Sequence, residues 1–173
     1  IGEVCAQTLF REGRAAAAAV AASTVNESLE AVVEANTLLS GLGFESGGVA
    51  AAHGVAQSYT AIPTVHANYL HGEMVAMGTL AQLMLEARPD EAAKVAEFFA
   101  TVGLPIHLGQ LSLAAGDNRA LDVLVEGTLA FPFIANMPQP VTAPMVRSAI
   151  LDAHRIGLSV TERIGDAAYR RLH

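Results

Sequence analysis

The sequence predicts an all-α protein, a helix bundle of about six or seven helices. Hydrophobic residues make up 52% of the chain, aromatic residues only 5%, and Trp is absent, so the core is expected to consist of Ala, Val, Leu, Ile and Met. Such aliphatic, alanine-rich material favours helices over sheets. Apolar residues recur at helical spacing, and no segment shows a convincing strand pattern.

The first part of the chain predicts two helices. Residues 3–22 form the first, which ends in an alanine-rich run. Ser23 and Thr24 break this pattern and offer caps for the second helix. Apolar residues of the second helix recur at helical spacing until Gly41 and Gly43, which are expected to end it.

Glycine and proline divide the middle of the chain into three further helices. Two consecutive glycines precede a helix over residues 49–59, and Pro63 lies in the loop that follows it. The next helix is predicted over residues 72–87. Pro89 suits the first turn of the third helix, and Gly103 suits its C-terminal cap.

The last third predicts two helices separated by a proline-rich loop. Asp117 is expected to cap a helix that continues through Thr128. Residues 131–140 are predicted not to form regular structure for long, because their prolines remove backbone donors. Thr142 is expected to start the last helix, whose apolar period continues to Ile164.

No repeat or linker divides the chain, so residues 1–173 are expected to form a single helical domain. The net charge of −7 leaves no basic stripe, so neither nucleic acid nor an anionic membrane is expected as a partner. The uncharged run 46–72 is long enough to span a bilayer, but Pro63 and its histidines and glycines argue against a membrane span. The lone Cys5 excludes an internal disulfide framework and favours a reducing, cytoplasmic location.

Residues 41–73 form the most informative stretch, because they hold His53 and His71, each beside a glycine. Imidazoles in so apolar a setting need hydrogen-bond partners or a metal. His71 stands at the start of a predicted helix, whose positive end keeps the imidazole neutral, the form that binds metals. Taken alone, each histidine is more simply explained as a hydrogen-bonded structural residue.

Two histidines are also one ligand short of a catalytic zinc site, which takes three protein ligands and an open position. Glu73 and His66 are the nearest candidates for a third ligand, but neither gives a recognised spacing. A dinucleotide-binding reading of Gly41–Gly47 fails, because these glycines follow a helix rather than a strand. Ser46 is not in a nucleophile elbow.

Longer strings of the sequence resemble a known family. EAVVEANTLLSGLGFESGGVAAAHGV, then TAIP and HGEMVAMGTLAQLMLE, resemble the C-terminal helical half of the glycerol dehydrogenases, members of the metal-dependent (iron-containing type) alcohol dehydrogenase family. The resemblance runs from QTLFREG through VGLPIHLGQL to the NMP at residues 136–138. It implies a dehydroquinate synthase-like helical domain without the N-terminal α/β domain that binds NAD, so the chain is expected to be a piece of a longer protein with no cofactor-binding residue of its own.

In that family the catalytic zinc lies in the cleft between the two halves, held by one aspartate and two histidines. By motif, the resemblance assigns metal binding to His53 in AAAHG and His71 in HGE, while the aspartate falls upstream of this chain. It also implies that Phe44 and Ser46 form part of the cleft wall that contacts substrate. Ala135 departs from the family, in which a histidine precedes the asparagine, and Met74 replaces a frequent lysine.

The resemblance implies NAD-dependent oxidation of glycerol, or a similar small polyol, to dihydroxyacetone or a related ketone, with Zn²⁺ or another divalent metal as Lewis acid. No catalytic residue is expected beyond the metal ligands, and the chain by itself is expected to be inactive. Two alternatives remain: another polyol or alcohol dehydrogenase branch of the family, and a non-catalytic helical assembly module whose histidines are structural. An exposed apolar cleft face predicts a homo-oligomer.

Overall fold

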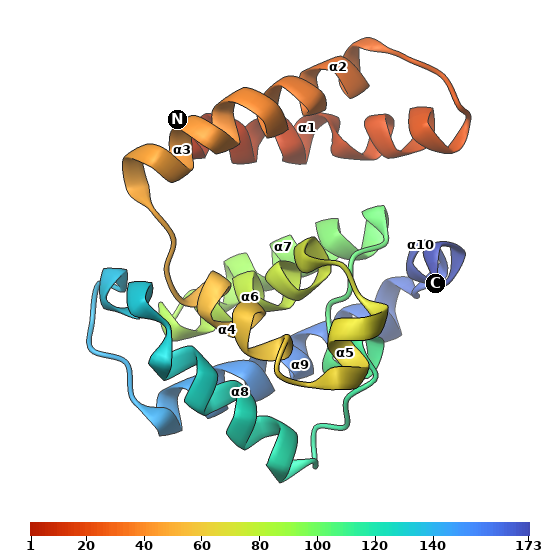
Figure 1. Cartoon of the computed structure of the whole chain (residues 1–173). Coiled ribbons are helices and arrows are strands. Elements are labelled where there is room, and N and C mark those ends of the chain that lie inside the picture. Colours follow the sequence, from red (N-terminus) through yellow and green to blue (C-terminus); the bar gives the residue numbers. More distant parts are fainter. The chain divides into compact units, whose positions relative to one another are not determined.

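The computed structural model describes residues 1–173, and it contains helices and turns but no strand (Figure 1). The predicted all-α class is therefore confirmed. Contacts divide the chain into two compact units, the N-terminal unit (residues 1–48) and the C-terminal unit (residues 49–173). That residues 1–173 form a single domain stays a prediction.

The N-terminal unit is a helical hairpin. Its first arm is α1 (Gly2–Ala21), and its second arm consists of α2 (Glu27–Glu34), the π-helical turn η1 (Ala35–Leu39) and α3 (Ser40–Gly47). The two arms pack against each other through α1 and α2.

The second arm differs from the prediction, because Gly41 and Gly43 lie inside α3 and do not end the helix. Glycine costs a helix interior only about 1 kcal/mol, which the surrounding turns can offset. The helix ends instead at Gly47, and the next residue, Gly48, has a φ of 69° that is readily available only to glycine.

The C-terminal unit holds the remaining helices, which are labelled in Figure 1. They are α4 (Ala51–Tyr59), α5 (Pro63–Asn68), α6 (His71–Leu85), α7 (Pro89–Val102), η2 (Leu108–Leu111), α8 (Asn118–Ala130), η3 (Pro132–Asn136), α9 (Ala143–Ile164) and α10 (Ala167–Leu172). Helix α6 is central and packs against α4, α7 and α9. Most of its side chains are buried, as expected for a helix apolar on nearly all sides.

The chain has ten α-helices, against the six or seven predicted. The additions are mostly short, such as α5 in the predicted loop after Pro63 and α10 after the last predicted helix. One or two turns cannot show an apolar period, so the sequence pattern gives no signal for them.

Local capping signals predicted several boundaries correctly. Pro89 begins α7, and Gly103 ends it in the left-handed conformation with φ of 86°. The side chain of Asp117 accepts a hydrogen bond from the backbone N–H of Ala120 in the first turn of α8. Thr142 precedes α9, as predicted, although its side chain makes no capping bond.

The core of the C-terminal unit is aliphatic, as the composition predicts. Its largest fully buried side chains include Tyr59, Met77, Leu80, Leu124 and Ile150, contributed by four different helices. The uncharged run 46–72 is divided among the end of α3, α4, α5, the first two residues of α6 and the turns between them. No helix in this chain combines the length and the apolar character needed to cross a bilayer.

Candidate metal centre

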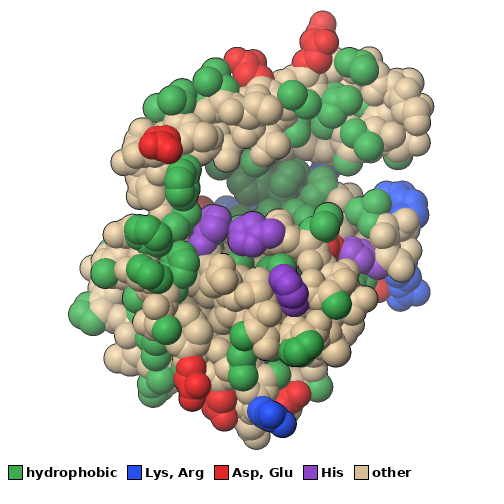
Figure 2. Space-filling model, in the orientation of Figure 1, with side chains coloured by type: hydrophobic (Ala, Val, Ile, Leu, Met, Phe, Trp, Pro, Cys, Tyr) green, Lys and Arg blue, Asp and Glu red, His purple; other side chains and the backbone are tan.

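His53 and His71 lie next to each other in the C-terminal unit. His53 is in the first turn of α4 and half-buried, and His71 is the first residue of α6 and exposed. Their ring centroids are 5.8 Å apart, with an angle of 50° between the ring planes. The two histidines singled out by the sequence are thus brought together, and Figure 2 shows histidine side chains at the surface of this unit.

This separation fits one shared ion. A metal bound about 2.0–2.1 Å from a nitrogen of each imidazole lies about 3 Å from each ring centre, so centroids roughly 5–6 Å apart are compatible with a single ion. The observed 5.8 Å falls in that range. That these rings bind a metal stays a prediction.

Close packing of α4 on α6 places the two rings. Gly78 of α6 faces the backbone of Ala52, the residue before His53, and a Cβ on Gly78 would lie 2.1 Å from the Ala52 carbonyl oxygen. Only glycine allows this approach of the two helices. The side chain of Gln82, one turn further along α6, accepts a hydrogen bond from the N–H of Ala52.

The electrostatic setting favours a neutral His53. Burial lowers the pKa of His53, and the neighbouring His71 lowers it further when charged. His53 is therefore neutral at pH 7, and the neutral imidazole is the form that donates a lone pair to a metal.

Neither local candidate for a third ligand joins the pair. The carboxylate of Glu73 is buried, accepts a hydrogen bond from Leu70 N–H at 2.7 Å and pairs with His173 Nε2 at 2.7 Å. His66 lies exposed on α5. The chain contains no group of three or more His, Cys, Asp or Glu side chains that could hold a metal ion. The chain thus supplies two imidazole donors, which suit Zn²⁺ but leave its protein ligand set incomplete.

A glutamate in the first turn suits the positive end of a helix, but the capping bond from Leu70 N–H to Glu73 was not predicted from the sequence. Glu at the third helical position is one half of a capping box, and that signal was present in the sequence. It was not recognised because Leu70, at the cap position, lacks the hydroxyl that forms the other half.

The predicted cleft-wall residues Phe44 and Ser46 lie on α3 of the N-terminal unit. Both are exposed, and Ser46 lines a hollow on that unit with residues of α1. Their contact with substrate stays a prediction.

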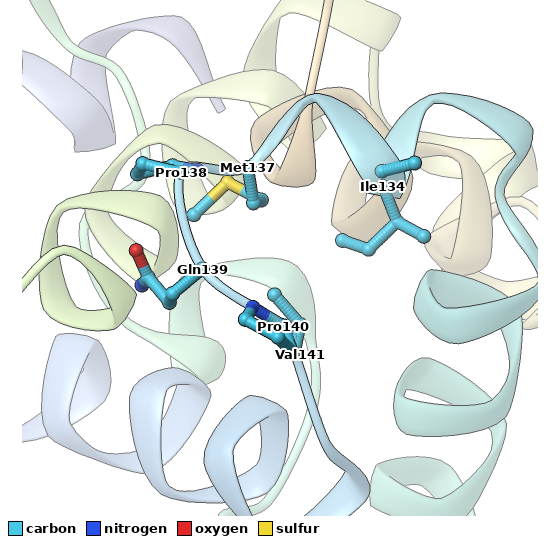
Figure 3. A pocket seen from close by; sticks show the side chains of 7 residues that line it. Ile134, Met137, Pro138, Gln139, Pro140 and Val141 are labelled. Atoms are coloured by element: carbon cyan, nitrogen blue, oxygen red, sulfur yellow. The ribbon is translucent and has the colours of Figure 1, made fainter.

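Two side-chain hydrogen bonds connect the proline-rich loop after α8 to the start of α4 and to the end of α6. The side-chain amide of Asn136 donates to the Val49 carbonyl just before α4, and that of Gln139 donates to the Leu85 carbonyl at the end of α6, both at 2.8 Å. The loop itself surrounds a pocket of about 330 Å³, shown in Figure 3, which is lined by Ile134, Ala135, Met137, Pro138, Gln139, Pro140 and Val141. Two polar side chains thus hold this loop, including its short 3-10 helix η3, against the ends of α4 and α6.

Comparisons with known proteins give close relatives. No protein-family model matches the chain. The chain is 42% identical over 165 residues to a glycolaldehyde reductase from Halobacterium salinarum and 45% identical over 159 residues to a glycerol dehydrogenase from Escherichia coli O6:H1. These alignments cover 94% and 91% of the chain but 45% and 43% of the relatives. The chain therefore spans less than half the length of these relatives.

Solved structures agree with the sequence comparison. A probable glycerol dehydrogenase from Sinorhizobium meliloti 1021 matches with a TM-score of 0.85 and 39% identity, covering 91% of this chain and 44% of that one. The glycerol dehydrogenase from Schizosaccharomyces pombe matches with a TM-score of 0.87 and 35% identity, covering 94% and 42%. The matched region is the helical domain of these oxidoreductases.

In fold and in sequence, the chain corresponds to the helical domain of these solved glycerol dehydrogenase structures. Over the region that it shares with these proteins, the chain is homologous to glycerol dehydrogenases.

Proposed function

We propose that this chain is the metal-ligand-bearing C-terminal domain of an NAD-dependent glycerol dehydrogenase that oxidises glycerol to dihydroxyacetone. The observation that carries the proposal is the pair of imidazoles of His53 and His71, whose centroids lie 5.8 Å apart. Relatives named glycerol dehydrogenase, at 45% and 42% identity, support the reaction and its substrate. NAD and the third, acidic ligand are assigned to a part of the protein outside residues 1–173.

Each residue of the proposed site has a defined part. His53, kept neutral by burial, and His71, at the start of α6, hold the ion. When bound, Zn²⁺ or another divalent ion acts as a Lewis acid toward the substrate oxygen. Glu73 fixes the first turn of α6 and thereby the backbone of His71. Phe44 and Ser46 contact the polyol, with a ring and a hydroxyl that suit its carbon backbone and its oxygens.

We further propose that the protein is a cytoplasmic homo-oligomer that binds neither nucleic acid nor membranes. A homo-oligomer is supported by exposed apolar side chains of the N-terminal unit: Val25, in the turn before α2, and Val33 and Leu38, on the second arm, line a hollow of about 540 Å³. A cytoplasmic location is supported by the single free Cys5. The net charge of −7 is the reason that neither nucleic acid nor an anionic membrane is included among the partners.

Zinc titration of the 173-residue chain tests the proposed site. A ligand that binds only the folded state stabilises it by about 2.7 kcal/mol at one hundred times its Kd. We expect Zn²⁺ to raise the Tm of the wild-type chain, and His53→Ala or His71→Ala to abolish the rise. His66→Ala is the matched control, because His66 is exposed on α5 and outside the pair. A Tm that does not respond to Zn²⁺ would contradict the metal site and favour the assembly module with structural histidines.

A separate assay tests the proposal that residues 1–173 alone do not oxidise glycerol. NADH production from glycerol is followed with the 173-residue chain alone and with a longer protein that includes the N-terminal domain. Only the longer protein is expected to turn over. Turnover by the chain alone at the rate of the longer protein would refute the proposal that NAD binds elsewhere.

A second candidate function is reduction of a small aldehyde. A glycolaldehyde reductase is 42% identical over 94% of the chain, a similarity comparable to that of the glycerol dehydrogenases. The residues of the helical part do not separate these two activities. A substrate panel on the longer protein, comparing kcat/KM for glycerol oxidation and glycolaldehyde reduction, decides between them.

A further inference from the structure

We infer that Gln82 is a positioning residue for the candidate metal centre: from α6 it holds the first turn of α4, and therefore His53, in register with His71. This inference rests on the proposed function for its purpose. The hydrogen bond from Ala52 N–H to Gln82, on which the inference is built, does not depend on a bound metal.

Helix α4 has no cap of its own. Ala50 occupies the cap position with an irregular backbone and has no side chain that could accept a hydrogen bond. The first backbone N–H groups of a helix have no partners inside that helix and need acceptors from elsewhere. Oε1 of Gln82 provides one, because it accepts from the N–H of Ala52 at 2.9 Å across a separation of 30 residues. His53 is the next residue in the same turn.

A second hydrogen bond, from Nε2 of Gln82 to Glu86, fixes the orientation of the Gln82 side-chain amide. Its Nε2 donates to Oε1 of Glu86 at 2.8 Å, and a carboxylate can only accept from it. Oε1 of Gln82 must therefore face α4. The second oxygen of Glu86 accepts from Arg88 Nη1 at 3.2 Å, which holds the carboxylate in place. A continuous series of polar bonds thus runs from Arg88 to the backbone beside His53.

Two contacts from α6 meet on the same residue of α4. Gly78 touches the carbonyl group of Ala52, and Gln82 accepts from its N–H. Gly78 and Gln82 are one turn apart on α6, so together they fix both the separation and the register of the two helices. Gln82 also lines an open hollow of about 310 Å³ with Thr79, Leu83 and Glu86. Its hydrogen bonds, more than close packing, therefore define its place.

The test uses three variants of the 173-residue chain. Gln82→Leu keeps the approximate size but removes the acceptor. Gln82→Glu keeps an acceptor for Ala52 but loses the donor to Glu86. Thr79→Val is the matched control, since Thr79 lines the same hollow and its hydroxyl bonds only within its own helix, to Val75. The measurements are the Kd for Zn²⁺ by calorimetry and the hydrogen exchange of the Ala52 and His53 amides by NMR.

Gln82→Leu is expected to weaken Zn²⁺ binding by at least about tenfold, the usual effect of losing a residue that orients a metal ligand. Exchange of the Ala52 amide is expected to become faster. Gln82→Glu should lie between Gln82→Leu and wild type in both the Kd for Zn²⁺ and the exchange rate of the Ala52 amide. Thr79→Val should leave both values near wild type. A merely structural glutamine would lower the Tm without changing the Kd of the folded protein.

The inference is overturned if Gln82→Leu binds Zn²⁺ as tightly as the wild-type chain, or no more weakly than Thr79→Val. Failure of the proposed function looks different, because the wild-type chain would then not bind Zn²⁺ at all. In that case the exchange data decide: unchanged protection of Ala52 in Gln82→Leu refutes the positioning role, and faster exchange supports it without a metal.

Discussion

Gly78 and Ala52 are in direct backbone contact between α6 and α4: a Cβ on Gly78 would lie 2.1 Å from the carbonyl oxygen of Ala52 and 2.9 Å from its carbonyl carbon. Neither backbone can yield alone, since both belong to regular helices. This contact sets how closely the helix of His53 approaches the helix of His71.

Gly78→Ala is therefore expected to destabilise the chain. Elsewhere in a helix this change gains up to about 1 kcal/mol, but forcing extra atoms into a packed contact costs about 1–3 kcal/mol or more. The control is Gly72→Ala on the same helix, where a Cβ meets nothing within 4 Å. Urea unfolding should show a loss of free energy for Gly78→Ala and none for Gly72→Ala; equal stability of the two variants would contradict the close contact.

Stability is expected to fall in mildly acidic solution because of His107 and His154. Their rings lie 6.0 Å apart where the segment before η2 packs on α9. Burial lowers the pKa of both, and the charge of His154 lowers that of His107 further, with Asp166 opposing. His154 Nδ1 also accepts from Leu108 N–H at 3.3 Å, which it can do only when that nitrogen carries no proton.

The lowered pKa values determine whether the free energy of unfolding rises or falls with pH. The unfolded chain binds protons at these histidines near the ordinary pKa of about 6.5, before the folded chain does. The contribution to stability is thus complete above that pH and is lost as the pH falls toward the lower folded pKa; His53 adds in the same direction. Urea unfolding between pH 7.5 and 5.5 measures this slope, which His154→Asn should reduce and the exposed control His66→Asn should leave unchanged. An equal slope in wild type and His154→Asn would exclude His154 as its source.

Glu73→Ala should be more damaging than Glu73→Gln. The alanine variant loses both the bond from Leu70 N–H and the pair with His173, whereas glutamine keeps an acceptor for Leu70. Loss of an N-terminal cap costs about 0.5–2 kcal/mol. Chemical denaturation of the two variants checks the order, and an alanine variant as stable as wild type would remove Glu73 from the account of α6.

Tyr59→Phe is expected to preserve or increase stability. The ring of Tyr59 is fully buried, its hydroxyl has no hydrogen-bond partner in the protein, and burial raises its pKa. A buried polar group without a partner costs about 1–3 kcal/mol, which phenylalanine avoids.

The matched variant is Tyr69→Phe, because the hydroxyl of Tyr69 shares a 2.7 Å hydrogen bond with Ser112. It should lose stability where Tyr59→Phe does not. A loss in Tyr59→Phe as large as in Tyr69→Phe would point to a bound water as the missing partner of Tyr59.

The sequence predicted those parts of the fold whose cause is local. Pro89, Gly103 and Asp117 mark helix ends through properties of the residue itself: a fixed φ, a left-handed conformation and a side-chain acceptor. The prediction that Gly41 and Gly43 end the second helix was wrong, because glycine only weakens a helix and α3 continues through both of them.

The candidate site, too, has a part that local sequence predicted and a part that depends on how distant residues pack. His53 and His71 were identified from the motifs around them, and the structure places their rings together. The bond from Ala52 to Gln82 could not be predicted, since it joins residues 30 apart and depends on how two helices pack. Gly78 carried no signal either, because a glycine within a helix does not reveal which backbone will approach it.

The nearness of His53 and His71 along the chain has a consequence for biosynthesis. Only α5 and its turns separate the two helices that carry them, so bringing the rings together closes a short loop, at a smaller entropic cost than a long one. Because domains fold from the N-terminus as the ribosome releases them, both imidazoles emerge well before α9 is synthesised. Under the proposal that the two imidazoles bind an ion, that ion would join α4 to α6 in the nascent chain before α9 exists.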